Sequence, residues 1–202
     1  MKAGAIAHKG FSMPVLVRLL FLITVLLPFP ALGAPLRIVA LGDSATSGWL
    51  VPRDQSYPAQ LQSMLRAKGY DVVVKNAGVP GDTTAGALKR FDRAVDPGTG
   101  LVLVELGTND LRLHVPAARM RANLAAIVRT LQRRKIAVLL IGLGSLDLSA
   151  LARATHVPYA QWKLPPHKYR ARDGAHFNGE GYRILLARTL PQIEALIGEA
   201  RR

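Results

Sequence analysis

Four short segments of this 202-residue chain hold the residue types that acyl transfer requires: GDSAT, NAGVPGDTT, LGTND and DGAHFNGEGY. The first contains Ser44, and the last contains Asp173 and His176, three residues apart. A serine hydroxyl is a weak nucleophile until a base takes its proton, and a histidine held by a carboxylate is such a base. The pattern therefore predicts Ser44 as nucleophile, His176 as general base and Asp173 as the group that orients the imidazole.

The same segments offer hydrogen-bond donors for the negative charge that develops on a carbonyl oxygen during acyl transfer. Gly78 permits a close backbone approach, Asn109 carries a side-chain NH₂ group, and the backbone N–H of Ser44 lies beside the nucleophile. We predict that these three residues form an oxyanion hole, with Gly81 as the neighbouring alternative to Gly78. Each residue alone also fits a structural role, as a turn glycine, a capping asparagine or an N-cap serine. The prediction therefore depends on the combination.

Other candidates for the base and for metal ligands are weaker. His8, His114, His156 and His167 lack an aspartate three residues before them, and only His167 lies close to Asp173 in the sequence. His167 is therefore the one alternative base. The histidines are scattered, the acidic residues do not gather near them, and the chain has no cysteine. The sequence accordingly predicts neither a metal site nor a cofactor.

Buried strand patterns alternate along the chain with amphipathic helical patterns. The predicted strands are RIVALG, DVVVKN, LVLVEL and IAVLLIGL, and the predicted helices cover about 56–68, 84–95, 116–134 and the residues after Gly179. This alternation predicts an α/β sandwich with a parallel sheet. Ligands in such sheets bind at the carboxyl ends of the strands, and Ser44, Gly78 and Asn109 each follow a predicted strand. The sheet would therefore bring three of the four segments to one edge.

The four segments, in this order, resemble those of the SGNH (GDSL-type) hydrolases, a family of esterases and lipases. The run from Leu41 to Asp110 is similar to the periplasmic multifunctional lysophospholipase–thioesterase–arylesterase group, as are PRDQSYPAQLQ and RANLAAIV. The resemblance extends from about Arg37 to the C-terminus. With the alternation of elements, it implies a three-layer α/β/α sandwich with a mainly parallel, flavodoxin-like sheet of five strands. It also implies a serine esterase that hydrolyses carboxylic esters, thioesters or lysophospholipids through an acyl-enzyme.

Two departures from the family pattern affect packing and specificity. The residue after the nucleophile is Ala45, where the family usually has leucine, and this removes apolar packing behind Ser44. The segment from Gly144 to Ala171 is abbreviated relative to the group and leaves less wall to bury an acyl chain. We therefore expect short to medium acyl esters as substrates. The alternative functions are a carbohydrate O-deacetylase of the cell envelope and a non-catalytic envelope-binding protein on the same fold.

Residues 1–33 have the composition of a signal peptide, and residues 34–202 would then form the hydrolase domain. The segment opens with basic residues and no acidic ones, continues with the apolar stretch LLFLITVLL, and ends in small residues before Ala34, where we expect cleavage. Met13 is an alternative start that leaves a shorter basic segment. The protein is thus predicted to be periplasmic or secreted, and an uncleaved membrane anchor is the alternative.

The chain carries 27 Lys and Arg against 13 Asp and Glu, a formal net charge of +14. Residues 1–33 hold three basic and no acidic residues, so the charge without them is +11. We expect a small-molecule or lipid ester as substrate and peripheral contact with an anionic membrane surface. Nucleic acid is not expected, since only 6% of residues are aromatic and none interleave with a basic cluster, and no obligate protein partner is inferred. Five basic residues are candidates for a charged entrance to the site: Arg153, Lys163, Lys168, Arg170 and Arg172.

Overall fold

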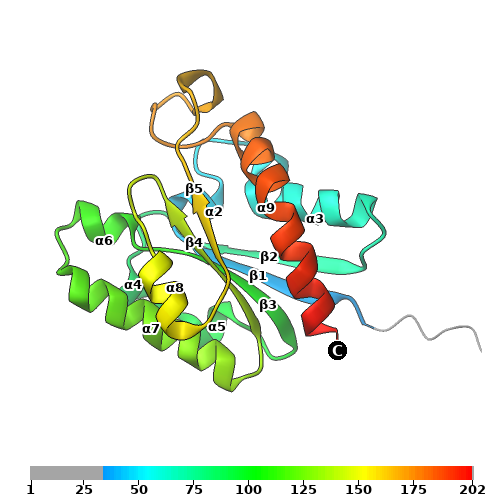
Figure 1. Ribbon diagram of the computed structural model, residues 1–202. Helices are drawn as coiled ribbons and strands as arrows, with labels where there is room; N and C mark the ends of the chain where they lie inside the picture. The colour runs from blue at the N-terminus through cyan, green and yellow to red at the C-terminus, as the bar shows by residue number, and fades with distance from the viewer. Residues whose placement is uncertain (1–33, 202) are drawn as a thin grey trace, which may run out of the picture. The chain divides into compact units, whose positions relative to one another are not determined.

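The computed structural model describes residues 34–201, which contain a five-stranded sheet (Figure 1). The strands are β1 (Leu36–Gly42), β2 (Val72–Gly78), β3 (Thr99–Glu105), β4 (Ala137–Leu143) and β5 (Tyr159–Trp162). Their spatial order is β2-β1-β3-β4-β5, and every neighbouring pair is parallel. This is the flavodoxin-like order, and it confirms the predicted fold class. The predicted signal peptide, residues 1–33, lies outside the described residues.

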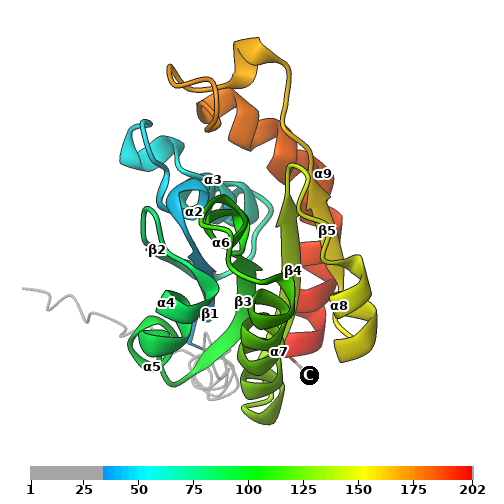
Figure 2. The same cartoon turned by 90° about the vertical axis from the view of Figure 1, so that its left-hand side faces the viewer.

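Helices cover both faces of the sheet (Figure 1, Figure 2). One face packs against α3 (Tyr57–Ala67) and α9 (Gly179–Ala200), and the other against α4 (Thr84–Lys89), α5 (Phe91–Ala94), α7 (Ala117–Arg133) and α8 (Ser149–Thr155). Side chains alternate between the two cores along a strand: Ile38 and Ala40 of β1 lie in the first core, and Val39 and Leu41 lie in the second. Because both faces are buried, the central strands β1, β3 and β4 are mostly apolar.

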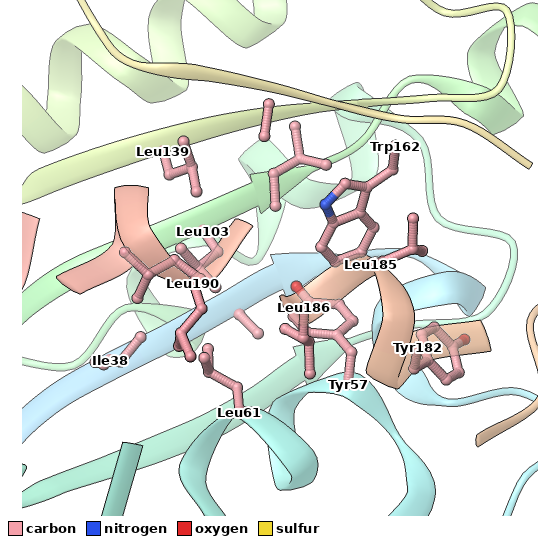
Figure 3. Packing of buried hydrophobic residues seen from close by; sticks show 14 of the residues in the cluster. Ile38, Tyr57, Leu61, Leu103, Leu139, Trp162, Tyr182, Leu185, Leu186 and Leu190 are labelled. Atoms are coloured by element: carbon pink, nitrogen blue, oxygen red, sulfur yellow. The ribbon is translucent and has the colours of Figure 1, made fainter. Parts of the chain in front are cut away.

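A cluster of aromatic side chains joins α3, β5 and α9 (Figure 3). Tyr57 and Trp162 are buried and meet edge to face, with ring centroids 5.0 Å apart at 89°. The Trp162 indole N–H donates to the Thr189 hydroxyl of α9 at 2.9 Å. Tyr182, near the start of α9, places its ring 6.2 Å from that of Tyr57. The cluster therefore fixes the start of α9, and with it the loop that precedes this helix, relative to the sheet.

The observed elements differ from the predicted ones in two places. Between Gly144 and Ala171, where we predicted no regular element, the chain forms α8, β5 and a 3₁₀ turn (His167–Tyr169). A strand of four residues carries too short a pattern to be distinguished from a loop. The helix predicted over 84–95 is two helices, α4 and α5, which meet at Arg90. No helix within residues 34–201 is long and apolar enough to cross a membrane.

Candidate active site

A cavity of about 770 Å³ lies at the carboxyl edge of the sheet. The turn after each strand and the loop before α9 all contribute to its wall, for example through Ser44, Gly81, Asn109, Ser145, Leu164 and His176. β1 and β3 are neighbours, and their onward connections through α3 and α7 run over opposite faces of the sheet. Such a switch point is where open α/β sheets bind ligands. Ser44 and Asn109 follow these two strands.

Ser44 is the first residue of a one-turn helix, α2 (Ser44–Ser47), that begins directly after β1. The Asp43 carboxylate caps this helix by accepting the Ala45 N–H at 3.0 Å. Gly42 lets the turn lie against the strand, because a Cβ at this position would fall 1.9 Å from the Thr46 hydroxyl oxygen. These contacts hold Ser44 at the cavity wall.

Tyr182 bonds to the nucleophile turn, residues 43–47, which carries Ser44. Its partner there is Ala45, which stands where the family usually has leucine. Ala45 is 2% exposed, and its carbonyl accepts a hydrogen bond of 2.7 Å from the Tyr182 hydroxyl. The Tyr182 ring also lies 5.3 Å from the buried ring of Phe177, which belongs to the loop before α9. Although Ala45 has a smaller side chain than leucine, the hydrogen bond from Tyr182 joins the turn directly to α9.

Ser44, His176 and Asp173 form one chain of hydrogen bonds. His176 Nε2 lies 2.8 Å from Ser44 Oγ, and His176 Nδ1 lies 2.5 Å from Asp173 Oδ2. Since a carboxylate only accepts, the proton belongs on Nδ1, and the lone pair of Nε2 faces the serine hydroxyl. The loop also holds Asp173 itself, because its Oδ1 accepts the N–H groups of Ala175 and His176, each at 3.0 Å.

These hydrogen bonds set the ionisation of Asp173. Desolvation acts to raise its pKa, but the bonds from the His176 N–H and ring, and from the Ala175 N–H, outweigh that effect and lower the pKa from 3.8 to about 2. Asp173 is therefore an anion throughout the neutral pH range, and its charge faces the imidazole of His176.

Several groups considered from the sequence lie away from the cavity. His167 is exposed on its 3₁₀ turn and does not line the wall. None of the five basic residues predicted for the entrance lines it either, and Arg112 of α6 (Thr108–Arg112) is the one lysine or arginine of the described chain that does. The positive charge at the site therefore comes from the turn after β3. Among residues 34–201, no three histidine, cysteine or acidic side chains are grouped to hold a metal ion.

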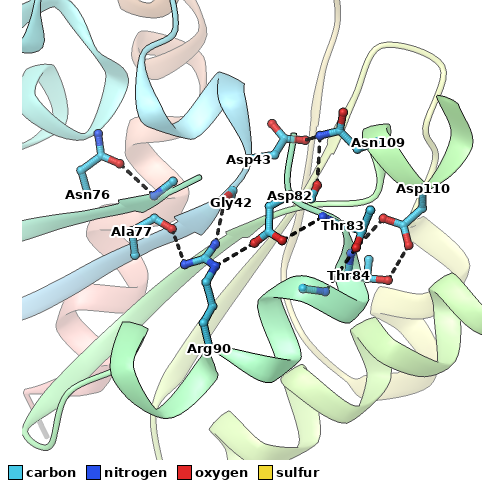
Figure 4. Close-up of polar contacts among 12 residues, drawn as sticks. Gly42, Asp43, Asn76, Ala77, Asp82, Thr83, Thr84, Arg90, Asn109 and Asp110 are labelled. Atoms are coloured by element: carbon cyan, nitrogen blue, oxygen red, sulfur yellow. Dashed lines mark hydrogen bonds and ion pairs between the residues drawn. The ribbon is translucent and has the colours of Figure 1, made fainter. Parts of the chain in front are cut away.

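Three partners hold the Asn109 side chain, which is 7% exposed. Its Nδ2 donates to Asp43 Oδ2 and to the backbone carbonyl of Asp82, both at 3.0 Å (Figure 4). Its Oδ1 accepts from the Arg112 guanidinium at 3.1 Å. Because arginine only donates and the other two partners accept, the amide has one possible orientation. Its nitrogen is thereby held next to the serine turn.

The structure corrects the prediction for Gly78. This residue does not line the cavity, and its N–H donates to Asn76 Oδ1 at 3.0 Å. Its missing side chain serves packing instead, because a Cβ there would fall 2.2 Å from the backbone nitrogen of Ser47. Gly81 does line the cavity, with a φ of +77°, open space at its Cβ position and no acceptor for its N–H among residues 34–201. Gly81, the alternative considered from the sequence, therefore lies at the cavity wall where Gly78 was expected.

Two carboxyl groups are buried behind the nucleophile. Glu105 is 1% exposed, its Oε2 accepts from the Thr46 hydroxyl at 2.9 Å, and its Oε1 has no partner in the described part of the chain. Burial, reinforced by the neighbouring Asp43 charge, raises the pKa of Glu105 well above its usual range. Burial also raises the pKa of Asp43, although the Ala45 N–H opposes this. Burial thus disfavours the charged form of both carboxyl groups, and the hydrogen bond from the Ala45 N–H offsets this for Asp43.

Several known proteins resemble this chain in sequence. A profile of the GDSL-like lipase/acylhydrolase family matches residues 40–162, well over half of the chain. An arylesterase of Vibrio mimicus is 35% identical over 114 residues, which are 56% of this chain and 57% of that protein. Esterase TesA of Pseudomonas aeruginosa is 35% identical over 112 residues, which are 55% of this chain and 56% of that protein. The chain thus spans little more than half the length of these two relatives.

A solved structure extends the likeness over most of the chain. AlinE4, an SGNH-hydrolase family esterase, is 30% identical, with a TM-score of 0.64, and the match covers 82% of this chain and 98% of that one. The predicted family resemblance is confirmed by these matches. The profile match includes Ser44 and Asn109 but ends before Asp173 and His176. The contacts among Asp173, His176 and Ser44 are therefore shown by the structure of this chain and not by the profile match.

We predict that Asp173→Asn lowers stability in a pH-dependent way. Because the folded pKa is depressed from 3.8 to about 2, the ionised carboxylate stabilises the fold above pH 3.8, and this contribution is lost as the pH falls through 2. The difference in unfolding free energy between wild type and variant, measured by urea titration, should be largest near neutral pH and shrink towards pH 2. A difference that stays constant over this range would contradict the assignment.

Proposed function

The chain belongs to the GDSL-like lipase/acylhydrolase family, and from that premise we propose that it is a serine esterase that hydrolyses carboxylic esters through an acyl-enzyme. The observation that carries this proposal is the hydrogen-bonded chain of Ser44, His176 and Asp173 at the wall of a cavity of about 770 Å³. Cavities of this size accommodate small-molecule ligands. A nucleophile, a base and an orienting carboxylate in contact are what acyl transfer needs, and simple binding to an envelope component needs none of them.

In the proposed reaction, Ser44 Oγ attacks the carbonyl carbon of the ester while His176 Nε2 takes the serine proton. The Asp173 anion stabilises the imidazolium that forms. His176 then gives the proton to the alkoxide oxygen as the ester bond breaks, so the alcohol leaves neutral. In the second half, a water molecule attacks the acyl-enzyme while the same nitrogen takes its proton. His176 then returns this proton to Ser44 Oγ as the bond to the serine breaks and the carboxylic acid leaves.

We propose that the N–H groups of Ser44 and Gly81 and the Nδ2 of Asn109 stabilise the tetrahedral oxyanion. Gly81 lies at the cavity, and its N–H has no acceptor within the described part of the chain; both observations support its role. One hydrogen of the Asn109 amide bonds the neutral carbonyl of Asp82 in the free protein. An oxyanion is a stronger acceptor than a neutral carbonyl, so it can share this donor as charge develops.

Apolar side chains at the cavity support an ester with a hydrophobic acyl or aryl group. Trp49, Leu111 and Leu164 line the wall, yet 48%, 41% and 44% of their surfaces are exposed. A bound acyl chain would cover these surfaces, and each buried CH₂ contributes about 0.8 kcal/mol. Leu164 follows β5 within the abbreviated segment, so this segment supplies part of the wall. We infer a preference for short to medium chains that end at this rim.

We also propose that the protein acts in the periplasm or outside the cell. The basic start, the apolar stretch LLFLITVLL and the small residues before Ala34 support export. The net charge of +11 that remains without residues 1–33 supports contact with an anionic membrane surface. N-terminal sequencing of the exported protein should find Ala34 first, and a membrane-bound protein that retains Met1 or Met13 would contradict cleavage.

Ser44→Ala should abolish both ester turnover and labelling by a fluorophosphonate, because both require the same nucleophile. The circular dichroism spectrum should not change, since Ser44 is held at a turn and not in the core. Ser63→Ala, on the exposed side of α3, is the control and should behave as the wild type. Turnover that survives in Ser44→Ala would refute the mechanism.

A second measurement separates the esterase from an O-deacetylase. The esterase should hydrolyse p-nitrophenyl esters without releasing acetate from acetylated sugars.

Asn109→Ala should lower kcat by about 10²–10³ and leave KM nearly unchanged, the usual result of losing one oxyanion donor. Asn123→Ala is the matched control. The Asn123 amide donates to the Thr84 hydroxyl at 3.0 Å, outside the cavity wall, so its loss should leave kcat intact. Steady-state kinetics on one p-nitrophenyl ester gives both constants. An effect of Asn109→Ala confined to KM would mean that the amide binds substrate and not the transition state.

In a series of p-nitrophenyl esters, kcat/KM should rise by about fourfold per CH₂ while the acyl chain remains within the apolar rim, and then level off. The reason is that methylenes beyond Trp49, Leu111 and Leu164 would remain in water. Measured values for acetyl to palmitoyl esters test this. A steady rise up to palmitoyl would show that another surface of the protein buries the long chain.

A further inference from the structure

Arg90 joins the ends of two strands to an aspartate (Figure 4). Its guanidinium donates to the backbone carbonyl of Gly42 at 3.0 Å, to that of Ala77 at 2.8 Å and to Asp82 Oδ2 at 2.7 Å. Gly42 and Ala77 lie at the carboxyl ends of β1 and β2, and Asp82 lies in the turn after β2. The planar guanidinium can satisfy these acceptors together because its donors point in fixed directions.

Burial distinguishes this ion pair from others in the described chain. The side chains of Arg90 and Asp82 are 17% and 10% exposed, whereas those of Lys75 and Asp96 are 38% and 45% exposed. A surface pair contributes little, because solvent screens it. In a buried pair, loss of one partner leaves the other charge without compensation. The Arg90–Asp82 pair therefore constrains the turn in which Asp82 lies.

This turn leads directly into the candidate active site. The Asp82 N–H donates to the Val79 carbonyl at 3.0 Å, which closes the turn around Gly81. The Asp82 carbonyl accepts from Asn109 Nδ2 at 3.0 Å. Asp82 thus contacts Arg90 through its side chain and Asn109 through its backbone, and it directly follows the glycine that lines the cavity.

We propose that Arg90 is a positioning residue for the oxyanion hole. Arg90 and Asp82 together fix the positions of the Gly81 N–H and the Asn109 Nδ2. Arg90 also bonds the carbonyl of Gly42, so these donors are held relative to the nucleophile turn. This role rests on the proposed esterase function. Arg90 does not line the cavity, so it acts through these groups and not on the substrate. Oxyanion donors must be preorganised, and a displacement of about 1 Å can cost about 10²-fold in rate.

Arg90→Met keeps the apolar stem and removes all three donations. We expect kcat to fall about 10- to 100-fold while KM changes less than about threefold, because the donors act in the transition state. The inhibition constant of a trifluoromethyl ketone, which adds to the serine as a tetrahedral oxyanion, should rise by the factor by which kcat/KM falls. Arg90→Lys should be intermediate, since an ammonium can pair with Asp82 but cannot span both carbonyls.

Asp82→Asn tests the same ion pair by changing the partner of Arg90. It should reproduce the kcat loss, and the double variant with Arg90→Met should lose little more than the worse single variant, because the two residues act as one unit. Lys75→Met is the matched control. It breaks the Lys75–Asp96 ion pair of 2.8 Å, which also involves β2 but no cavity residue, and it should keep the wild-type kcat.

Urea titration of each variant separates positioning from stability. Unchanged kcat and ketone affinity in Arg90→Met and Asp82→Asn, with only a lower urea midpoint, would overturn the positioning role. If Arg90→Met does not fold, Arg90→Lys and Asp82→Asn provide the same comparison. Wild-type protein that neither turns over esters nor is labelled at Ser44 would refute the esterase proposal itself, and this outcome is distinct from a failure of Arg90 to position the donors.

Discussion

The turn that carries Ser44 and the amide of Asn109 both depend on one buried carboxyl group, that of Asp43. Its side chain is almost fully removed from water, and a buried carboxylate is tolerated only when hydrogen-bond donors compensate it. The donors are the Ala45 N–H, which begins the helix that starts at Ser44, and the Asn109 amide from the turn after β3. Folding that satisfies Asp43 therefore also sets the nucleophile and a candidate oxyanion donor in their places. Burial raises the pKa of the neighbouring Glu105, and a charge on Asp43 raises it further because like charges repel.

The imidazole reaches the serine through the packing of α9, although His176 and Ser44 are 132 residues apart in the chain. Asn178 caps this helix by accepting the Gly181 N–H at 2.9 Å, so the loop that holds His176 ends at a defined residue. The Tyr182 hydroxyl then bonds the carbonyl of Ala45, within the nucleophile turn itself. The helix and the turn are thus joined at Ala45, one residue from Ser44. The packing of α9 therefore helps to set the distance between His176 Nε2 and Ser44 Oγ.

Long apolar patterns in the sequence predicted the corresponding strands and helices correctly. The prediction failed where an element is very short, and where one residue type can be required for two different reasons. β1 to β4 and α7 have long patterns and were located, whereas the four residues of β5 were not. Gly78 and Gly81 both follow β2, but one glycine is required by contact with α2 and the other by a left-handed backbone at the cavity. Sequence alone does not separate these causes. Arg90 gave no signal, since two of its three partners are backbone carbonyls.

The charges around the cavity match the charges that ester hydrolysis would develop. Asp173 bonds the imidazole, so its negative charge would stabilise the imidazolium that forms when His176 takes the serine proton. On the other side, Arg112 donates to the Asn109 oxygen, which polarises the amide and strengthens its N–H groups as donors to an oxyanion. A second negative charge at Glu105 would oppose an oxyanion at this edge of the sheet, and burial together with the neighbouring Asp43 disfavours that charge by raising the pKa of Glu105. The burial of this acid behind Ser44 thus acts in the same direction as the proposed oxyanion donors.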